Sequence, residues 1–307
     1  SYRKNVRCKN KKKVVRRLIF RRGGYKDMSN SSKLISKMEV KSRQLRKKIL
    51  ETCIKAGTGH VTSSLSCLDI MIALYHGQIL NFDPKDPDWG GRDRFILSKG
   101  QASPAYYTIL ADLGYFGMKE LDKFAQKDGK FGVHLQKDVP GVEITSGSLG
   151  HGFGVGAGIA LAAKMNKELY LTFVLIGDGE CYEGSIWETA MFASHNRLNN
   201  LIVIIDRNYL CVTDFTENLV ALEPMEDKWK SFGWDVLKID GHSFEDIFNS
   251  LKEIRSQKSI RPLVIIADTV KGKGVKSMCY NPLWHGLAPR GREAEVARKC
   301  LEEEENE

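Results

Sequence analysis

The chain of 307 residues is 42% hydrophobic, which allows one or two domains with a substantial core, but no apolar run approaches the roughly 18–20 residues of a membrane span. Its seven cysteines include no Cys-x-x-Cys pair, which argues against a disulfide framework or a structural zinc site and favours a reducing, cytoplasmic compartment. The net charge of +9 does not indicate a nucleic-acid-binding body, because residues 1–27 alone hold twelve Lys or Arg and one acid, which leaves a net −2 for the remainder.

The basic residues are concentrated in an N-terminal tail, residues 1–33, which we separate from an α/β domain over residues 34–307. The tail has few apolar residues outside two short runs, a composition typical of disorder. A basic arm for nucleic acid or an anionic membrane is the functional alternative. A run of charge does not specify a partner, so we expect neither a nucleic-acid nor a membrane partner.

The remaining residues predict alternating helices and strands. Apolar residues at helical spacing indicate helices at residues 34–56, 67–75, 103–113, 118–125, 153–165, 186–198 and 244–256. Short, nearly continuous apolar runs indicate strands at residues 94–98, 171–176, 201–205, 235–239 and 263–268. Such runs are typical of parallel strands that are buried on both faces. The predicted fold class is therefore α/β, with a mainly parallel sheet and helices on both faces.

Polar residues that suit a metal and a phosphate follow two of these strands. Asp178 lies between Gly177 and Gly179 after one strand, and Asn208 follows the next strand thirty residues later. Ligands of parallel sheets bind at the carboxyl ends of the strands, so we expect both side chains at one site. Their oxygens suit Mg²⁺, and the two glycines let the backbone approach a phosphate. The alternative is a tight strand-to-helix turn with a capping aspartate.

This Gly-Asp-Gly with a later Asn resembles the thiamine diphosphate fingerprint of thiamine-dependent enzymes. The segment GSLGHG at residues 147–152 and the Glu183-Gly184 pair are similar to transketolase, and the likeness runs from about residue 38 to about residue 286. It matches the first, diphosphate-binding half of that family. The resemblance implies an N-terminal subunit of a split transketolase, which transfers a two-carbon ketol unit from a ketose (phosphate) to an aldose (phosphate). The implied cofactors are thiamine diphosphate and Mg²⁺, with Ca²⁺ or Mn²⁺ as substitutes.

His60 and His285 lie in further segments that resemble the family, and His134 lies a few residues before another. The resemblance implies that His60 and His134 contact the hydroxyls of the sugar donor. It also implies that His285 contacts the diphosphate and polarises substrate oxygens, as donors do next to a developing oxyanion. Any one of them alone is more often a surface or capping histidine. The further segments are residues 57–60 (GTGH), 93–102 (DRFILSKGQA), 140–150 (PGVEITSGSLG), 271–274 (KGKG) and 284–286 (WHG).

The resemblance also implies the contacts of the cofactor. The metal ligands would be Asp178, Asn208 and Leu210. The cofactor-binding residues would be Gln101, Gly147, Leu149, Gly177, Asp178, Gly179, Glu183, Asn208 and His285.

Several of these positions have a plainer interpretation or depart from the family. Gly147 and Leu149 also fit a glycine turn with an apolar staple. Glu183 and Glu188 resemble interface acids near the cofactor, or else are solvent-facing helix charges. At Gln101 the family usually has His, and glutamine can donate a hydrogen bond but cannot titrate. His151 in place of the commoner Gln, and Val61 in place of Pro, are further departures.

Other enzymes share the Gly-Asp-Gly fingerprint. They are 1-deoxyxylulose-5-phosphate synthase and the decarboxylating component of 2-oxo acid dehydrogenases, and the three histidine segments favour transketolase over both. A non-catalytic protein that has kept a transketolase half is a further alternative. The intact Asp178, Asn208 and histidines argue against it, although Gln101 leaves it open.

The resemblance implies a partner. In the family, the acid for the pyrimidine ring and most of the sugar-phosphate clamp lie in the second half, and no second sheet pattern follows residue 268. We therefore expect a C-terminal, pyrimidine-binding subunit, in a heterotetramer with two of each chain. The apolar helix at residues 153–165 and the face at residues 183–188 should then be buried between subunits.

Overall fold

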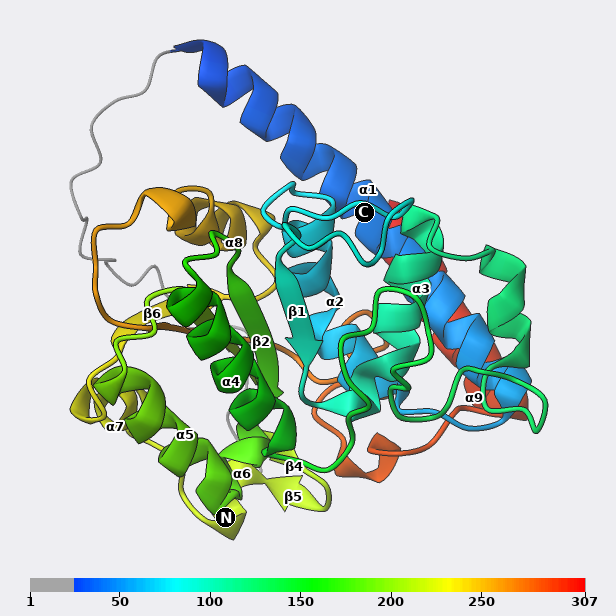
Figure 1. Ribbon diagram of the computed structural model, residues 1–307. Helices are drawn as coiled ribbons and strands as arrows, with labels where there is room; N and C mark the ends of the chain where they lie inside the picture. The colour runs from blue at the N-terminus through cyan, green and yellow to red at the C-terminus, as the bar shows by residue number, and fades with distance from the viewer. Residues whose placement is uncertain (1–24, 307) are drawn as a thin grey trace.

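The computed structural model describes residues 25–306 and is built on a five-stranded parallel sheet (Figure 1). The strand order is β1-β2-β3-β7-β6, and each neighbouring pair runs parallel. All five strands lie where the sequence predicted them: β1 Arg94–Leu97, β2 Thr172–Gly177, β3 Leu201–Arg207, β6 Asp235–Asp240 and β7 Leu263–Asp268.

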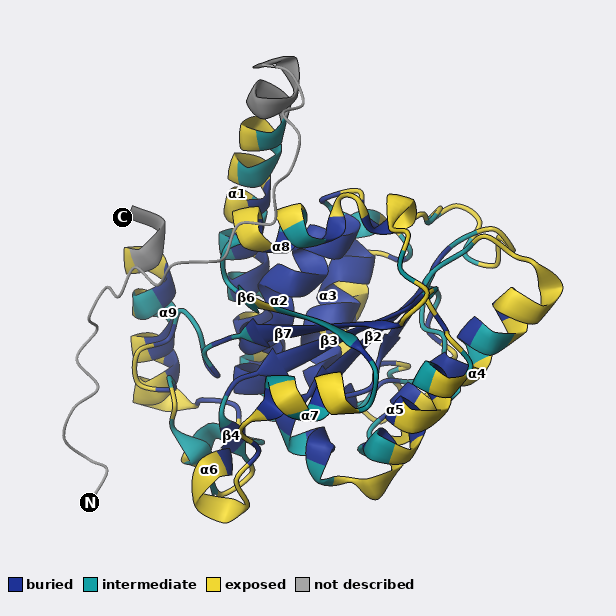
Figure 2. Ribbon diagram, turned by 90° about the vertical axis from the view of Figure 1, so that its left-hand side faces the viewer, coloured by how far each residue is buried: buried dark blue, intermediate teal, exposed yellow. Residues whose placement is uncertain are grey.

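Helices cover both faces of the sheet, which confirms the predicted α/β class (Figure 2). One face carries α1 Tyr25–Ala56, α2 Val61–Tyr75, α3 Ser103–Leu113 and α8 Phe244–Leu251. The other face carries α4 His151–Asn166, α5 Gly184–His195 and α7 Met225–Ser231. The last helix, α9 Gly291–Asn306, lies beside α1 (Figure 1), where Arg298 forms an ion pair with Glu51.

The two apolar cores follow from the alternation of side chains along each strand. In β2, Phe173 and Leu175 join the core beneath α1, α2 and α3, whereas Val174 and Ile176 join the core beneath α4 and α5. Successive side chains of a strand point to opposite faces, so a run of consecutive apolar residues fills both cores at once. The apolar runs therefore predicted both the strands and their double coverage.

Several helix boundaries differ from the prediction. The first helix begins at Tyr25 rather than residue 34, because no Pro or Gly interrupts residues 25–33 and hydrogen bonding continues outward from the packed part. The second begins at Val61 rather than residue 67, since Thr62, Ser63, Ser64 and Ser66 are buried polar residues that hide its apolar spacing. The segment predicted as a helix at residues 118–125 is a 3₁₀ helix, Met118–Lys123.

The remaining boundaries shift by a few residues. The helix predicted at 153–165 is α4, that at 186–198 is α5, and the one at 244–256 ends at Leu251 before a short 3₁₀ turn, Ile254–Ser256. Elements that the sequence did not predict are α6, α7, α9, the 3₁₀ turns Gly100–Ala102, Asp178–Tyr182 and Pro282–Trp284, and the hairpin of β4 and β5. The bounds of the hairpin and of α6 are Leu210–Cys211, Asp214–Phe215 and Thr216–Leu219.

Of the tail predicted at residues 1–33, residues 1–24 lie outside the described residues and residues 25–33 belong to α1. Within residues 25–306, no helix combines the length and the apolar character that crossing a bilayer requires.

Candidate functional site

The site lies at the carboxyl edge of the sheet. Asp178 follows β2, and Asn208 follows β3. Gly177, the last residue of β2, pairs in register with Asp206 of β3, so the ends of the two strands lie side by side. Strand β7 ends at Asp268 in register with Arg207 and leads to Lys271. The sheet thus brings together segments that are far apart in the sequence.

Asp178 is a buried carboxylate held by several donors. Its Oδ1 accepts a hydrogen bond from the Gly179 amide at 2.8 Å, and its Oδ2 accepts from the Tyr209 amide at 2.6 Å and from Arg207 Nη1 at 3.1 Å. Burial raises the pKa of Asp178, because the Arg207 guanidinium compensates only part of the lost hydration. A further positive charge at this carboxylate would therefore stabilise its ionised form.

Asn208 is oriented by its neighbours so that its amide oxygen faces the following turn. Its Nδ2 donates to Asp206 Oδ2 at 3.1 Å, while its Oδ1 accepts from the Leu210 amide at 3.2 Å. Asp206 in turn forms a buried ion pair with Lys99 and accepts a hydrogen bond from Ser66 at 2.6 Å. Burial favours its neutral form, but the Lys99 ammonium outweighs this and lowers the pKa of Asp206. The pair fixes the base of the site.

Lys271 connects one predicted metal ligand, Leu210, to the histidines. Its ammonium donates to the carbonyl of Leu210 at 3.2 Å and lies 3.2 Å from His285 Nδ1. Burial, together with the nearby Lys99 charge, lowers the pKa of Lys271 to about 8. At neutral pH Lys271 is therefore still mainly a cation. It contacts the Leu210 carbonyl, an oxygen that the sequence assigned to the metal.

The three predicted histidines meet in space. The ring centroids of His60 and His134 are 5.4 Å apart, and those of His60 and His285 are 5.5 Å apart. Burial, with help from nearby positive charge, lowers the pKa of both His60 and His285 to about 4. Both rings are accordingly neutral at pH 7, where they can donate or accept a hydrogen bond without carrying charge.

Local backbone geometry places two of these rings. His60 occupies the N-cap position of α2, after a loop in which Gly59 has φ +125°. A Cβ on Gly59 would lie 2.8 Å from Cys53 Sγ, so only glycine fits there. His285 follows the 3₁₀ turn Pro282–Trp284, and the Trp284 carbonyl accepts a hydrogen bond from Thr62 of α2 at 3.0 Å.

Gln101 and Gly147 lie next to His134. Gln101 Nε2 donates to the Gly147 carbonyl at 3.4 Å, and a Cβ on Gly147 would meet the His134 ring at 3.0 Å. Gly147 has φ +143°, a conformation that favours glycine. Leu149 is half-buried in the same loop.

Glu180 ties the loops of the site together, a role that the sequence did not predict. It is buried, and its Oε1 accepts from Ser98 Oγ at 2.6 Å and from the Gly150 amide at 2.9 Å. Its Oε2 accepts from the Gly177 amide at 2.8 Å. One carboxylate therefore joins the segments after β1, before α4 and after β2.

The acids predicted at an interface face outward. Glu183 and Glu188 are both exposed, and the side chain of Glu183 passes over Gly150, where an added Cβ would approach it to 2.8 Å. This position is compatible with solvent and with a partner chain alike.

The residues present fit a hard cation beside an anionic ligand. Within residues 25–306, no group of three or more His, Cys, Asp or Glu side chains is arranged to hold a metal, so a single carboxylate, Asp178, would be aided by the oxygens of Asn208 and Leu210. Mg²⁺ commonly uses such a small protein set and completes its shell with phosphate and water. Two buried polar atoms, His60 Nδ1 and Gln101 Oε1, have no hydrogen-bond partner in the structure. Unpartnered buried atoms of this kind suit a polar ligand.

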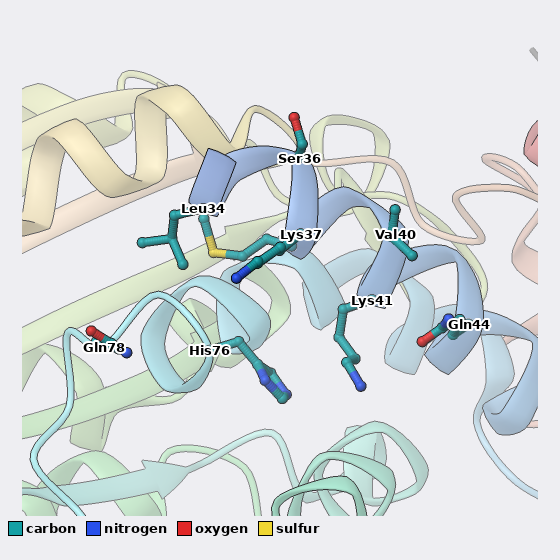
Figure 3. A pocket seen from close by; sticks show the side chains of 9 residues that line it. Leu34, Ser36, Lys37, Val40, Lys41, Gln44, His76 and Gln78 are labelled. Carbon is teal, nitrogen blue, oxygen red and sulfur yellow. The ribbon is translucent and has the colours of Figure 1, made fainter. Parts of the chain in front are cut away.

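An open groove of about 570 Å³ lies elsewhere, between α1 and the end of α2 (Figure 3). It is lined by Leu34, Ser36, Lys37, Met38, Val40, Lys41, Gln44, His76 and Gln78, none of which the sequence assigned to the site. Despite its size, this groove is therefore not the candidate functional site, because none of the predicted site residues lines it.

Sequence reasoning missed Lys99, Asp206 and Lys271 as members of the site. All three are charged residues that are at most 5% exposed, and each lies at or just beyond the end of a strand. Charge directly after an apolar strand was the available signal, because such residues must be paired or bind a ligand.

Comparison with protein families and known proteins agrees with this geometry. Residues 38–304 match the family described as transketolase, thiamine diphosphate binding domain. The chain is 40% identical to one of the subunits of apulose-4-phosphate transketolase from Phocaeicola vulgatus, over 88% of this chain and 95% of that protein. It is also 40% identical to a 6-deoxy-6-sulfo-D-fructose transketolase subunit of Clostridium sp. (strain MSTE9), over 77% of this chain and 86% of that protein.

A solved transketolase from Campylobacter jejuni has a similar fold, with a TM-score of 0.78 and 30% sequence identity. The match covers 88% of this chain but 43% of that one. The chain thus spans less than half of the solved transketolase, although it spans nearly all of the two subunits.

Proposed function

The chain belongs to the transketolase family and carries its thiamine diphosphate-binding domain, and we propose that with a second subunit it transfers a two-carbon ketol unit between sugars. The donor is a ketose or its phosphate, and the acceptor is an aldose or its phosphate. The observation that carries the proposal is the meeting of His60, His134 and His285 and their link, through Lys271, to the carbonyl of Leu210, whose amide donates a hydrogen bond to Asn208.

In this proposal the strand ends hold the diphosphate and its metal. Asp178, Asn208 and the Leu210 carbonyl supply hard oxygens for Mg²⁺, or for Ca²⁺ or Mn²⁺ in its place. Gly177 and Gly179 let the backbone approach the diphosphate. Thiamine diphosphate, when bound, supplies the nucleophilic carbon and the electron sink that a ketose cleavage needs.

The histidines act on the sugar. His60 and His134 hydrogen-bond to the donor hydroxyls, and His285 contacts the diphosphate and polarises the substrate oxygens. The neutral rings of His60 and His285 suit this role, because sugar hydroxyls are uncharged donors and acceptors. Lys271 adds positive charge on the side of the diphosphate. Gln101 and Gly147 lie next to His134 and support the cofactor, together with Leu149 and Glu183.

Family membership favours transketolase over the two other thiamine enzymes that share the fingerprint. A non-catalytic transketolase-like protein is tested by isothermal titration of thiamine diphosphate with Mg²⁺ into the chain mixed with its partner. Binding is the expected result, and its absence would favour the non-catalytic protein.

We also propose that the partner is a C-terminal, pyrimidine-binding subunit, in an assembly of two of each chain. The similar proteins named as subunits support this, since this chain spans 95% and 86% of them. Exposed apolar residues lie beside His285 and on α5: Leu283 and Leu287, which flank His285, are 77% and 58% exposed, and Met191 of α5 is 52% exposed. A partner chain would bury them, together with the small-residue face of α4.

One assay tests the two-subunit proposal. The purified chain, saturated with thiamine diphosphate and Mg²⁺ and free of any partner by mass spectrometry, should show no ketol transfer. Robust turnover would mean that the site is complete within one chain type.

We place the enzyme in a reducing compartment such as the cytoplasm, because the six cysteines within residues 25–306 are all free thiols.

A further inference from the structure

A largely buried polar network contacts the residue that precedes Lys271, and it includes none of the three histidines of the site. Its centre is His242, in the turn between β6 and α8. His242 Nδ1 lies 2.7 Å from Asp69 Oδ2, and His242 Nε2 accepts a hydrogen bond from the backbone amide of Val270 at 2.9 Å. Val270 immediately precedes Lys271 in the chain. One imidazole thus joins α2 to the segment that presents Lys271.

The two contacts define the protonation state of the ring. A backbone amide can only donate, so Nε2 must be the unprotonated acceptor. Nδ1 therefore carries the proton and donates it to Asp69. This arrangement resembles the support of a metal-bound histidine, in which the hydrogen bond of one ring nitrogen fixes the role of the other. Here, however, the supported group is a peptide bond of the site.

Asp69 is itself rigidly held. It is 2% exposed, forms an ion pair with Arg46 of α1, and accepts a hydrogen bond from Ser42. Burial favours the neutral acid, but the Arg46 guanidinium and the His242 ring outweigh burial and lower the pKa of Asp69 to about 2. A buried carboxylate that is fully ionised and paired is a fixed anchor for the ring.

The same network holds the Lys271 segment from its other side. Arg46 Nη1 donates to the carbonyl of Lys273 at 3.3 Å and to that of Leu65 at 2.9 Å. The Gly272 amide donates to the Thr62 carbonyl of α2 at 3.1 Å. Backbone groups on both sides of Lys271 are therefore fixed to α1, α2 and His242, while the Lys271 ammonium reaches Leu210 and His285.

We propose that His242, anchored by Asp69 and Arg46, is a positioning residue that fixes the Thr269–Val270 peptide, directly before Lys271, and so aims the Lys271 ammonium at the diphosphate-binding side of the site. The inference deepens the proposed function, because one of its two tests, the measurement of cofactor affinity, rests on that function. His242 touches neither Lys271 Nζ nor any predicted metal ligand in the hydrogen bonds of residues 25–306, so it acts through the backbone amide of Val270 alone.

The two ring nitrogens can be tested separately by amide side chains of different length. His242→Asn places an amide near Nδ1, so it can keep the contact with Asp69 but offers no acceptor to the Val270 amide. His242→Gln places its Oε1 near Nε2, so it keeps that acceptor and gives up the contact with Asp69. If the acceptor is what matters, the Gln variant should retain the position of Lys271 and the Asn variant should lose it.

The first readout is hydrogen–deuterium exchange at the Val270 amide, measured in the full chain by mass spectrometry with fragmentation. We expect exchange in His242→Asn to be at least about 10-fold faster than in the unmodified chain, and in His242→Gln to be within about threefold of it. The second readout is the affinity for thiamine diphosphate with Mg²⁺ in the assembled enzyme, measured by titration. It should fall about 10-fold or more in the Asn variant, the size typical of losing a supporting hydrogen bond, and little in the Gln variant.

A matched control is His76 at the other end of α2, whose Nε2 lies 3.2 Å from Asp112 Oδ2. His76→Asn disturbs a second histidine–carboxylate pair that has no contact with the site, and it should leave both readouts unchanged. Thermal midpoints of all variants separate general destabilisation from positioning.

The inference is wrong if the Val270 amide exchanges at the same rate in the Asn and Gln variants. It is also wrong if the loss of cofactor affinity in the two variants is only proportional to the fall in their thermal midpoints. Should the unmodified enzyme bind no thiamine diphosphate, the proposed function fails. The exchange comparison would still decide whether His242 holds the Val270 peptide.

Discussion

Replacing the buried Asp69 by Asn should lower the stability of the domain and remove a specific part of its acid sensitivity. The folded pKa of about 2 lies below the ordinary value of 3.8, a difference that corresponds to about 2.5 kcal/mol of stabilisation at about 1.4 kcal/mol per pKa unit. Asn also leaves the Arg46 guanidinium buried without a counter-charge, and breaking such a pair typically costs about 3–5 kcal/mol in all. We therefore expect a loss of about 3–5 kcal/mol at pH 7.

The sign of the pH dependence follows from the lowered pKa. The contribution of Asp69 is complete above pH 3.8, the unfolded value, and it declines as the pH falls toward about 2, the folded value. The difference in unfolding free energy between the unmodified chain and Asp69→Asn should therefore be constant from pH 5 to pH 7. At pH 3 it should be smaller by about 1 kcal/mol, because the unfolded state of the unmodified chain then binds the proton more readily than the folded state does.

The assay is thermal unfolding followed by circular dichroism at pH 7, 5 and 3. For a domain of this size, about 1 kcal/mol shifts the midpoint by roughly 2–4 °C, so Asp69→Asn should lower it by roughly 6–20 °C at pH 7. Asp112→Asn is the control, since Asp112 is half-buried and its pair with Lys41 is partly exposed, and a smaller shift is expected. A midpoint within about 2 °C of the unmodified chain at pH 7, or a difference that grows as the pH falls, would refute the assignment of Asp69 as an ionised, paired anchor.

Three further outcomes follow from the site. Asp178→Ala should abolish ketol transfer when Mg²⁺ is limiting and weaken thiamine diphosphate binding, and Asn208→Ala should weaken it in the same direction; normal turnover of the Asp178→Ala enzyme at scarce Mg²⁺ would contradict the metal assignment. His134→Ala should lower kcat/KM for the donor ketose by about 10-fold or more, the effect of a lost hydrogen bond in a dry site, and should spare cofactor affinity; a fall in cofactor affinity with unchanged donor kinetics would show that its role is misassigned. Glu180→Gln should weaken the junction of three loops and lower the free energy of cofactor binding by more than it lowers the free energy of unfolding, as titration and calorimetry on one preparation would reveal. Equal losses in these two free energies would make Glu180 purely structural.

The sequence predicted the residues that would bind the metal and the sugar more fully than the buried charged residues that hold them in place. Asp178 and Asn208 could be paired from sequence because both follow apolar strands, and neighbouring parallel strands place their carboxyl ends together. The three histidines came from family resemblance, and the structure brings the rings of His134 and His285 to within 5.5 Å of the His60 ring. Glu180 and Lys271 were not assigned. Charge close behind an apolar strand was a signal for both, but the groups that they contact, such as Ser98 and the Leu210 carbonyl, lie on segments far away in the sequence.

What the sequence determined by itself is the order of the strands along the chain, their burial on both faces, and the pair of oxygen ligands at two strand ends. These properties are local: a run of apolar residues specifies a buried strand, and the polar residue that follows it is carried to the sheet edge. The start of α2 and the existence of α9 are not local in this sense, because packing against the rest of the domain stabilises helices whose own apolar spacing is weak.

Only the tertiary structure decided which charges are buried and what they hold. His242 and Asp69 are 173 residues apart in the chain, and Lys99 and Asp206 are 107 apart, yet each pair is in contact. No periodicity in the sequence encodes such pairs, because the energy that keeps a buried charge ionised comes from the partner that the fold brings to it. The support of Lys271 by His242 belongs to this class, and so do the neutral histidines, whose lowered pKa values arise from burial among other positive charges.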